Sequence, residues 1–138
     1  MNSPHALVLD TGILIALFDS GDAYHNSAKV GIVLLEQQKT RLFVPAAVVL
    51  ETAKRLLFDT NSSTMHTAID NMLETLEIFD TSKTSIQVAK DFAANIKAWN
   101  GTLEDAMVAK MALTYRIPVW TMNYRDFAAI PKLEFWNP

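Results

Sequence analysis

The sequence contains no cysteine, which rules out disulfide bonds, thiolate zinc sites and cysteine nucleophiles. No uninterrupted apolar run approaches the roughly 18 residues that a membrane span needs. The first five residues, Met-Asn-Ser-Pro-His, lack the basic start of a secretion signal. The histidines, His5, His25 and His66, lie far apart and form no motif. We therefore expect a soluble, cytoplasmic protein that has no membrane segment and does not bind metal through histidine.

The chain does hold enough apolar material for one folded core. Half of its 138 residues are hydrophobic. This length suits one domain, since domains most often hold about 100–150 residues. No repeat, low-complexity tract or linker interrupts the sequence. We therefore expect residues 1–138 to form a single domain.

Short apolar runs alternate with longer stretches of helical character. We expect strands at residues 6–9, 41–44, 76–79 and 119–121, a last edge strand at 133–136, and helices at 13–18, 25–38, 46–58, 63–76, 83–99 and 102–115. This alternation predicts an α/β fold in which a mainly parallel sheet lies between two layers of helices. Such folds bind ligands at the C-terminal ends of the strands, where the strand order reverses.

Acidic residues recur at positions that this layout brings to one edge of the sheet. Asp10 ends the first strand, Glu51 lies in the second turn of the helix after the second strand, and Asp105 lies in the first turn of a later helix. Asn123 and Asp126 follow the fourth strand. Converging carboxylates repel one another, and a cation among them relieves that repulsion. Because Mg²⁺ and Mn²⁺ prefer oxygen ligands, the pattern predicts a site for one of these ions.

A divalent ion held by carboxylates suits the hydrolysis of a phosphodiester bond. Such an ion acidifies a bound water and neutralises charge on the phosphate and the leaving oxygen. The net charge of −3 argues against a protein that grips nucleic acid by charge alone. Once the four candidate ligands, Asp10, Glu51, Asp105 and Asp126, are set aside, basic residues outnumber acidic ones by one. The composition is therefore compatible with a nucleic-acid substrate.

Asp10 and Glu51 also have structural interpretations, and the surroundings of Asp105 predict that it is partly buried. Asp10 can cap the helix that follows it. Glu51 lies opposite the apolar face of its helix, where an ion pair with Lys54 or Arg55 is the alternative. Asp105 borders a stripe of small apolar residues, which favours a half-buried carboxylate that needs a cation or several hydrogen-bond donors.

Asp105, Asn123 and Asp126 also have structural interpretations that depend only on neighbouring residues. Thr102 and Asp105 can form a capping box at the start of their helix. Asn123 can occupy a left-handed turn, and Asp126 can cap a short helix.

The residues around Asp10 argue against two other enzyme classes. The segment Leu9-Asp10-Thr11-Gly12 spells the signature of aspartic proteases, but their fold is all-β and needs a second such triplet, which this helix-rich chain lacks. A phosphatase with an aspartyl nucleophile requires an acid two residues after Asp10, where Gly12 stands.

Five segments occur in order along the chain: Leu7-Val-Leu-Asp10-Thr-Gly-Ile-Leu-Ile-Ala-Leu, Asp22-Ala-Tyr-His25, Val48-Val-Leu-Glu51, Glu104-Asp105-Ala-Met-Val-Ala and Thr121-Met-Asn-Tyr-Arg-Asp126-Phe. Together they resemble the PIN domain family, and most closely its VapC-like ribonuclease toxins of type II toxin–antitoxin modules. No single segment is specific, but the ordered set covers nearly the whole chain.

The resemblance implies a three-layer α/β/α fold and Mg²⁺- or Mn²⁺-dependent cleavage of single-stranded RNA. Asp10, Glu51 and Asp105 match three acids of the family's metal site, and Thr11 matches a Ser or Thr that supports it. The fourth position is often Asp in the family. In this chain it is Asn123, and Asp126 offers the remaining carboxylate.

The resemblance also implies two protein partners. Members of the family usually form homodimers and are blocked by a small antitoxin whose C-terminal segment enters the acidic cleft. From the sequence, Leu14, Ile32 and Phe58 can belong either to the core or to a dimer interface.

The sequence thus favours a metal-dependent endoribonuclease in which Asp10 and Asp105 hold the main ion. Glu51 and Asp126 orient water or complete a second site, while Thr11 and Asn123 support them through hydrogen bonds. Water attacks phosphorus in line with the leaving 3′ oxygen.

Basic side chains complete this hypothesis, and we expect Lys54, Arg55 or Arg125 to contact the RNA backbone. The alternative is a PIN-like scaffold that binds RNA or a protein without cutting. Asn123 and the orientation of Glu51 keep that alternative open.

Overall fold

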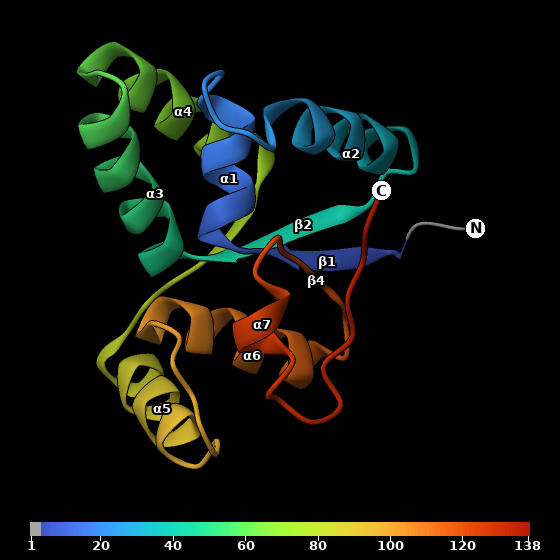
Figure 1. The fold of residues 1–138 in the computed structure, drawn as a ribbon, viewed down its shortest axis with the longest axis vertical. Coiled ribbons are helices and arrows are strands. Elements are labelled where there is room, and N and C mark those ends of the chain that lie inside the picture. The colour runs from blue at the N-terminus through green and yellow to red at the C-terminus, as the bar shows by residue number, and fades with distance from the viewer. Residues whose placement is uncertain (1–3) are drawn as a thin grey trace.

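A four-stranded sheet lies at the centre of the protein, which we describe from a computed structural model over residues 4–138 (Figure 1). The strands are β1 (Ala6–Leu9), β2 (Arg41–Pro45), β3 (Glu77–Phe79) and β4 (Val119–Trp120). Their order is β3-β2-β1-β4, and each pairing is parallel. The predicted parallel α/β sheet is confirmed.

Helices cover both faces of this sheet. On one side lie α1 (Thr11–Phe18), α2 (His25–Gln37), α3 (Ala46–Asp59) and α4 (Ser62–Thr75), and on the other lie α5 (Lys83–Ala94), α6 (Leu103–Tyr115) and α7 (Tyr124–Phe127) (Figure 1). The three-layer α/β/α arrangement is therefore confirmed. Within residues 4–138, no helix is long and apolar enough to cross a membrane.

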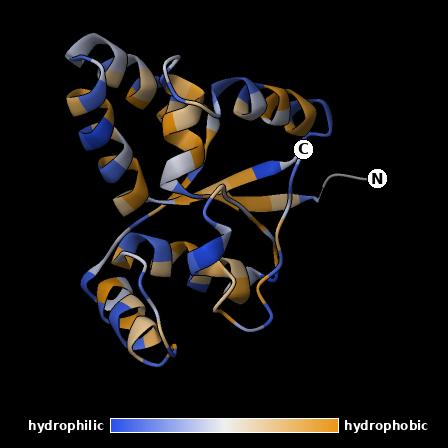
Figure 2. Ribbon diagram, viewed as in Figure 1, coloured by the Kyte–Doolittle hydropathy of each residue, from blue (hydrophilic) through white to orange (hydrophobic). Residues whose placement is uncertain are grey.

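The core is built around β1, whose four residues are all buried. Val8 pairs with Phe43 of β2 on one side and with Val119 of β4 on the other. Figure 2 shows the apolar colouring continuing from these strands into α1. A strand covered by helices on both faces reads as a continuous apolar run, which is why this segment was recognisable in the sequence.

Two expected elements are shorter in the structure. The helix expected at 83–99 ends at Ala94, where the side chain of Asn95 folds back and its Nδ2 donates to the Asp91 carbonyl at 2.8 Å, and Ala98 then adopts a φ of 61°. The edge strand expected at 133–136 is reduced to one bridge between Val119 and Phe135, since β4 offers only two residues for pairing.

The structure distinguishes the three residues that the sequence assigned either to the core or to a dimer interface. Leu14 is fully buried and Ile32 packs against the core, whereas the Phe58 side chain is 76% exposed. Phe58 is therefore not a core residue.

The strand order reverses between β1 and β4. From β1 the chain extends the sheet first toward β2 and β3, and only later adds β4 on the opposite side. Neighbouring parallel strands whose connections leave in opposite directions open a crevice at their C-terminal ends. Asp10 follows β1, and Thr121 follows β4, at this point of the fold.

Candidate active site

Asp10 is a buried carboxylate at the C-terminal end of β1, only 3% exposed. It caps α1 by accepting a hydrogen bond from the Ile13 amide at 2.9 Å, so the capping interpretation is correct. Burial raises the pKa of the Asp10 carboxyl to about 6. Hydrogen bonds lower this pKa in part, and the charges of Asp105 and Glu51 raise it further. A capping role and a place beside other acids thus coexist in one side chain.

Thr121 holds the second oxygen of Asp10 and was missed by the sequence analysis. Its side chain is fully buried, and its hydroxyl donates to Asp10 Oδ2. The same hydroxyl accepts a hydrogen bond from the Asn123 amide at 2.8 Å. The signal available in the sequence was a threonine at the end of the strand expected at 119–121. The hydrogen bond from Thr121 to Asp10 connects the C-terminal ends of β4 and β1.

Glu51 lies in the second turn of α3, as expected, and is half-buried. Its Oε1 accepts a hydrogen bond from the hydroxyl of Thr11, the first residue of α1. Burial raises the pKa of Glu51, the hydrogen bond from Thr11 lowers it, and the charges of Glu104 and Asp105 raise it again. Glu51 therefore faces other acids at this edge of the sheet.

The alternative pairing of Glu51 with Lys54 or Arg55 is wrong. In the part of the chain that the structure describes, the one salt bridge joins Arg41 to Glu77 at 2.6 Å, on the exposed side of β2 and β3. Glu51 points instead toward Thr11, because α3 begins at the sheet edge and presents this position to the start of α1.

Asp105 lies in the first turn of α6, where it forms the expected capping box with Thr102. The Asp105 amide donates to Thr102 Oγ1 at 3.1 Å, and the Thr102 amide donates to Asp105 Oδ2 at 3.4 Å. The carboxyl is half-buried, as predicted. Burial raises its pKa, the Thr102 hydrogen bonds lower it, and the charges of Asp126 and Glu104 raise it.

Asn123 and Asp126 contact each other directly. The Asn123 amide nitrogen Nδ2 donates to Asp126 Oδ2 at 2.8 Å. Asn123 has a φ of −102°, so the interpretation as a left-handed turn is wrong. Asp126 lies inside α7 and is not its cap, because the helix already begins at Tyr124. Asn123 is exposed and Asp126 is half-buried.

Glu104 is a further acid that the sequence analysis did not select. Its charge acts on both Glu51 and Asp105. It borders a hollow of about 470 Å³ that is lined by Ala47, Leu50, Glu51, Lys54, Arg55 and Glu104. Its position next to Asp105 in the first turn of α6 was the only signal in the sequence. The hollow brings two basic side chains alongside the acids.

The candidate ligands lie at one edge of the sheet, but they do not surround a common position that an ion would occupy. In residues 4–138, no group of three or more His, Asp or Glu side chains is arranged to hold a metal ion. Asp10, Asp105 and Asp126 each accept hydrogen bonds from neighbouring groups instead. The donor set nevertheless fits a hard divalent cation, since it consists of carboxylate oxygens whose mutual repulsion a cation would relieve.

Solved structures of toxins and toxin–antitoxin complexes have a similar fold. VapC20 from Mycobacterium tuberculosis, a sarcin-ricin loop cleaving toxin, is 17% identical with a TM-score of 0.81 over 96% of this chain and 99% of that one. VapBC2 from Rickettsia felis, bound to a promoter DNA fragment, is 19% identical with a TM-score of 0.74 over 96% and 98%. A toxin–antitoxin complex from Klebsiella pneumoniae is 24% identical with a TM-score of 0.64 over 92% and 94%.

The sequence comparisons give the family. No curated protein matches the chain. The sequence profile of the PIN domain matches residues 7–133, a range that begins in β1, extends past β4 and includes all the candidate acids. This protein, with its parallel sheet and its acids collected at one edge, therefore belongs to the PIN domain family.

Proposed function

We propose that this protein is an endoribonuclease that depends on Mg²⁺ or Mn²⁺. The observation that carries the proposal is the buried Asp10, whose carboxyl lies among the acids Glu51 and Asp105 at the crevice between β1 and β4. A buried carboxylate among like charges is costly unless a cation offsets it. Membership of the PIN domain family supports nuclease chemistry at this place.

In this proposal Asp10 and Asp105 are the main metal ligands, and Glu51 and Asp126 complete the set. A bound divalent ion would supply positive charge at the scissile phosphate and acidify water. The side chain of Thr121 fixes the orientation of the Asp10 carboxylate by donating to one of its oxygens.

The supporting residues act by holding the ligands or the substrate. Thr11 positions the Glu51 carboxylate, and Asn123 positions that of Asp126, each through a hydrogen bond. Lys54 and Arg55, which line the hollow beside Glu51, would contact the phosphates of the RNA backbone. Arg125, exposed on α7, is a third candidate for this role.

We extend the proposal to the role of a toxin in a type II toxin–antitoxin module in the cytoplasm. The fold likeness to VapC and VapBC structures supports an antitoxin partner. A short open reading frame overlapping the start of the gene would favour this role.

A homodimer is part of the same proposal. The exposed apolar side chains of Leu50, Phe58 and Leu73 lie on α3 and α4, which pack against each other. A second copy of the chain that covers these exposed apolar side chains would remove them from water.

The decisive experiment is a titration of the purified protein with Mg²⁺ or Mn²⁺ against a mixed panel of RNAs. We expect cleavage that requires the ion, that stops with EDTA and that is abolished in Asp105→Asn. The capping box allows this variant to fold, because an asparagine oxygen can still accept from Thr102. Asp70→Asn, on α4, is the matched control and should cleave normally. Activity that survives EDTA or Asp105→Asn would contradict the mechanism.

A second candidate is a PIN scaffold that binds RNA or a protein without cutting. It is favoured by the absence, within residues 4–138, of three acids arranged around one ion, and by the neutral Asn123. This candidate predicts no cleavage with either ion and no metal-induced rise in melting temperature. The same titration therefore separates the two functions.

A further inference from the structure

The loop between α5 and α6 folds the indole of Trp99 back over Gly101. The loop begins with a turn in which the Trp99 amide donates to the Ile96 carbonyl at 3.3 Å. Within this turn Ala98 has a φ of 61°. A Cβ on Gly101 would lie 2.4 Å from Cζ2 and 2.8 Å from Cη2 of Trp99. The ring therefore occupies the place of any side chain at position 101.

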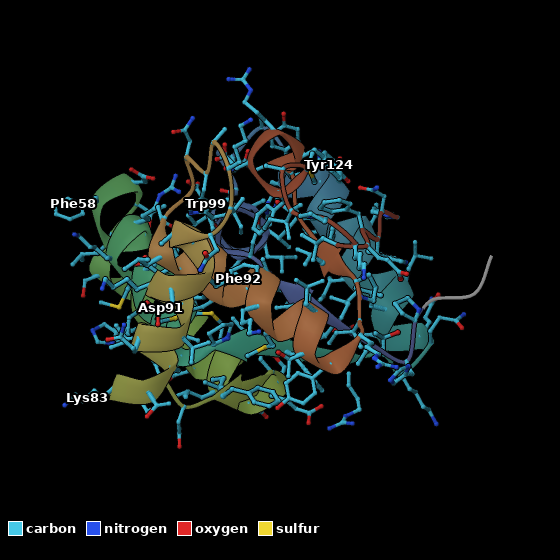
Figure 3. The ribbon with its side chains drawn as sticks, turned by 90° about the horizontal axis from the view of Figure 1, so that it is seen from below. Phe58, Lys83, Asp91, Phe92, Trp99 and Tyr124 are labelled. Atoms are coloured by element: carbon cyan, nitrogen blue, oxygen red, sulfur yellow. The ribbon has the colours of Figure 1, made fainter. Side chains whose placement is uncertain are left out.

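The indole also packs against α7. The rings of Trp99 and Phe127 meet edge to face, with centroids 6.3 Å apart and an angle of 74° between their planes. Phe127 is fully buried and follows Asp126 directly in the chain. The Trp99 Nε1 atom is itself buried and has no hydrogen-bond partner among the described residues. In Figure 3, Trp99 lies between the end of α5 and the helix that carries Tyr124.

This position joins two segments that carry candidate ligands. Gly101 is followed at once by Thr102, the cap of α6, and so by Asp105 in the first turn. Phe127 stands beside Asp126 in α7. The Trp99 ring therefore contacts both the segment that leads into Asp105 and the helix that carries Asp126.

We propose that Trp99, clamped between Gly101 and Phe127, is a positioning residue that sets the distance between the carboxylates of Asp105 and Asp126. It contacts neither the substrate nor the ion. Its ring acts as a spacer, since aromatic packing fixes the approach of two segments more rigidly than a flexible side chain would. The inference rests on the proposed function, because it concerns how that metal site is held together.

The test is calorimetric titration of the metal-free protein with Mn²⁺ at a temperature well below unfolding. We expect Trp99→Leu and Gly101→Ala each to weaken Mn²⁺ binding by about tenfold, the lower end of the effect of altering residues that support metal ligands. Trp99→Phe keeps an aromatic spacer and should bind almost as the wild type does. In Trp99→Leu/Gly101→Ala the clashing ring is gone, so the double variant should bind no more weakly than Trp99→Leu alone.

Tyr115→Leu is the matched control. Tyr115 packs edge to face against Phe43, with centroids 5.6 Å apart, at the opposite end of α6 from Asp105, so this variant loses a similar aromatic contact away from the proposed site. We expect it to lower the melting temperature without changing the Mn²⁺ affinity.

The outcomes are distinguishable. If the wild type binds Mn²⁺ and Trp99→Leu binds it equally well, the positioning role is overturned and the proposed function stands. If the wild type binds no Mn²⁺, both are overturned. Should Gly101→Ala fail to fold, as circular dichroism would reveal, the comparison of Trp99→Leu with Trp99→Phe decides the question.

Discussion

Asp10 and Thr121 are 111 residues apart in the sequence, yet the hydroxyl of Thr121 donates directly to the carboxylate of Asp10. The contact follows from the parallel pairing of β1 with β4, which brings the ends of the first and last strands together. It also links the candidate site to the core, since both residues are buried.

Replacing this hydroxyl should destabilise the protein. Thr121→Val keeps the shape of the side chain but leaves a buried acceptor without its donor, which costs about 1–3 kcal/mol. Thr121→Ser retains the donor and should cost less. Urea unfolding of the three proteins measures the difference. A Thr121→Val protein as stable as the wild type would show that the hydrogen bond contributes nothing.

The stability of the metal-free protein should depend on pH through Asp10. Its pKa is about 6 in the folded protein, raised from the ordinary aspartate value of 3.8 that the unfolded chain retains. The folded state therefore binds more protons between these values, and stability falls as pH rises. From pH 5 to pH 7 this group alone should cost about 1 kcal/mol.

Urea unfolding in EDTA at the two pH values tests this dependence. Asp10→Asn removes the titrating group, so it should be more stable than the wild type at pH 7 and should lose much of the pH dependence. A wild-type protein that becomes more stable from pH 5 to pH 7 would contradict the raised pKa.

Asn123→Asp should strengthen metal binding. The new carboxylate would stand beside Asp126, where the present amide donates a hydrogen bond at 2.8 Å. Without metal the two acids repel each other, and with metal they supply one more ligand. We expect a lower melting temperature in EDTA and a larger rise on adding Mn²⁺ than in the wild type. Asn71→Asp, on α4, should change neither quantity.

Gly31→Ala should destabilise the fold without involving the site. Its Cβ would lie 2.4 Å from Cζ2 of the fully buried Trp120. Overpacking of this kind costs about 1–3 kcal/mol, which outweighs the helix propensity of alanine. Gly21→Ala is the control, because there the nearest atom is 3.3 Å away and belongs to the Asp19 side chain in an exposed turn. Thermal unfolding of both variants checks the prediction.

Phe58→Ser should alter oligomeric state more than stability. The side chain is 76% exposed in the single chain, so its loss should leave the unfolding of a monomer nearly unchanged. If the α3 and α4 surface forms the proposed homodimer, light scattering should report a shift toward monomer. Ile86→Ser, on α5 in the opposite layer, should keep the wild-type mass.

Much of the fold was predictable because its central strand is short and wholly apolar. The residues of β1 form an unbroken buried run, and the acid that follows them marks the strand end. The capping box of Thr102 and Asp105 was also predictable, since it depends only on residues three apart. The catalytic roles of Asp10, Glu51, Asp105 and Asp126 remain predictions.

What could not be predicted depends on contacts between distant segments. A helical pattern continues past Ala94, but the chain leaves the helix there, and the loop that follows packs Trp99 against Gly101 and Phe127. Thr121 reads as an ordinary strand-ending residue until β4 is placed beside β1. The direction of Glu51 likewise depends on the start of α1, which lies 40 residues earlier.

The strand order also has a consequence for how the protein is made. The central strand β1 is synthesised before β2 and β3, while its other neighbour β4, which is followed directly by Thr121, is synthesised after all three. An incomplete nascent chain therefore lacks the closing wall of the crevice. The contact between Asp10 and Thr121 therefore forms only after β4 has been synthesised and has paired with β1.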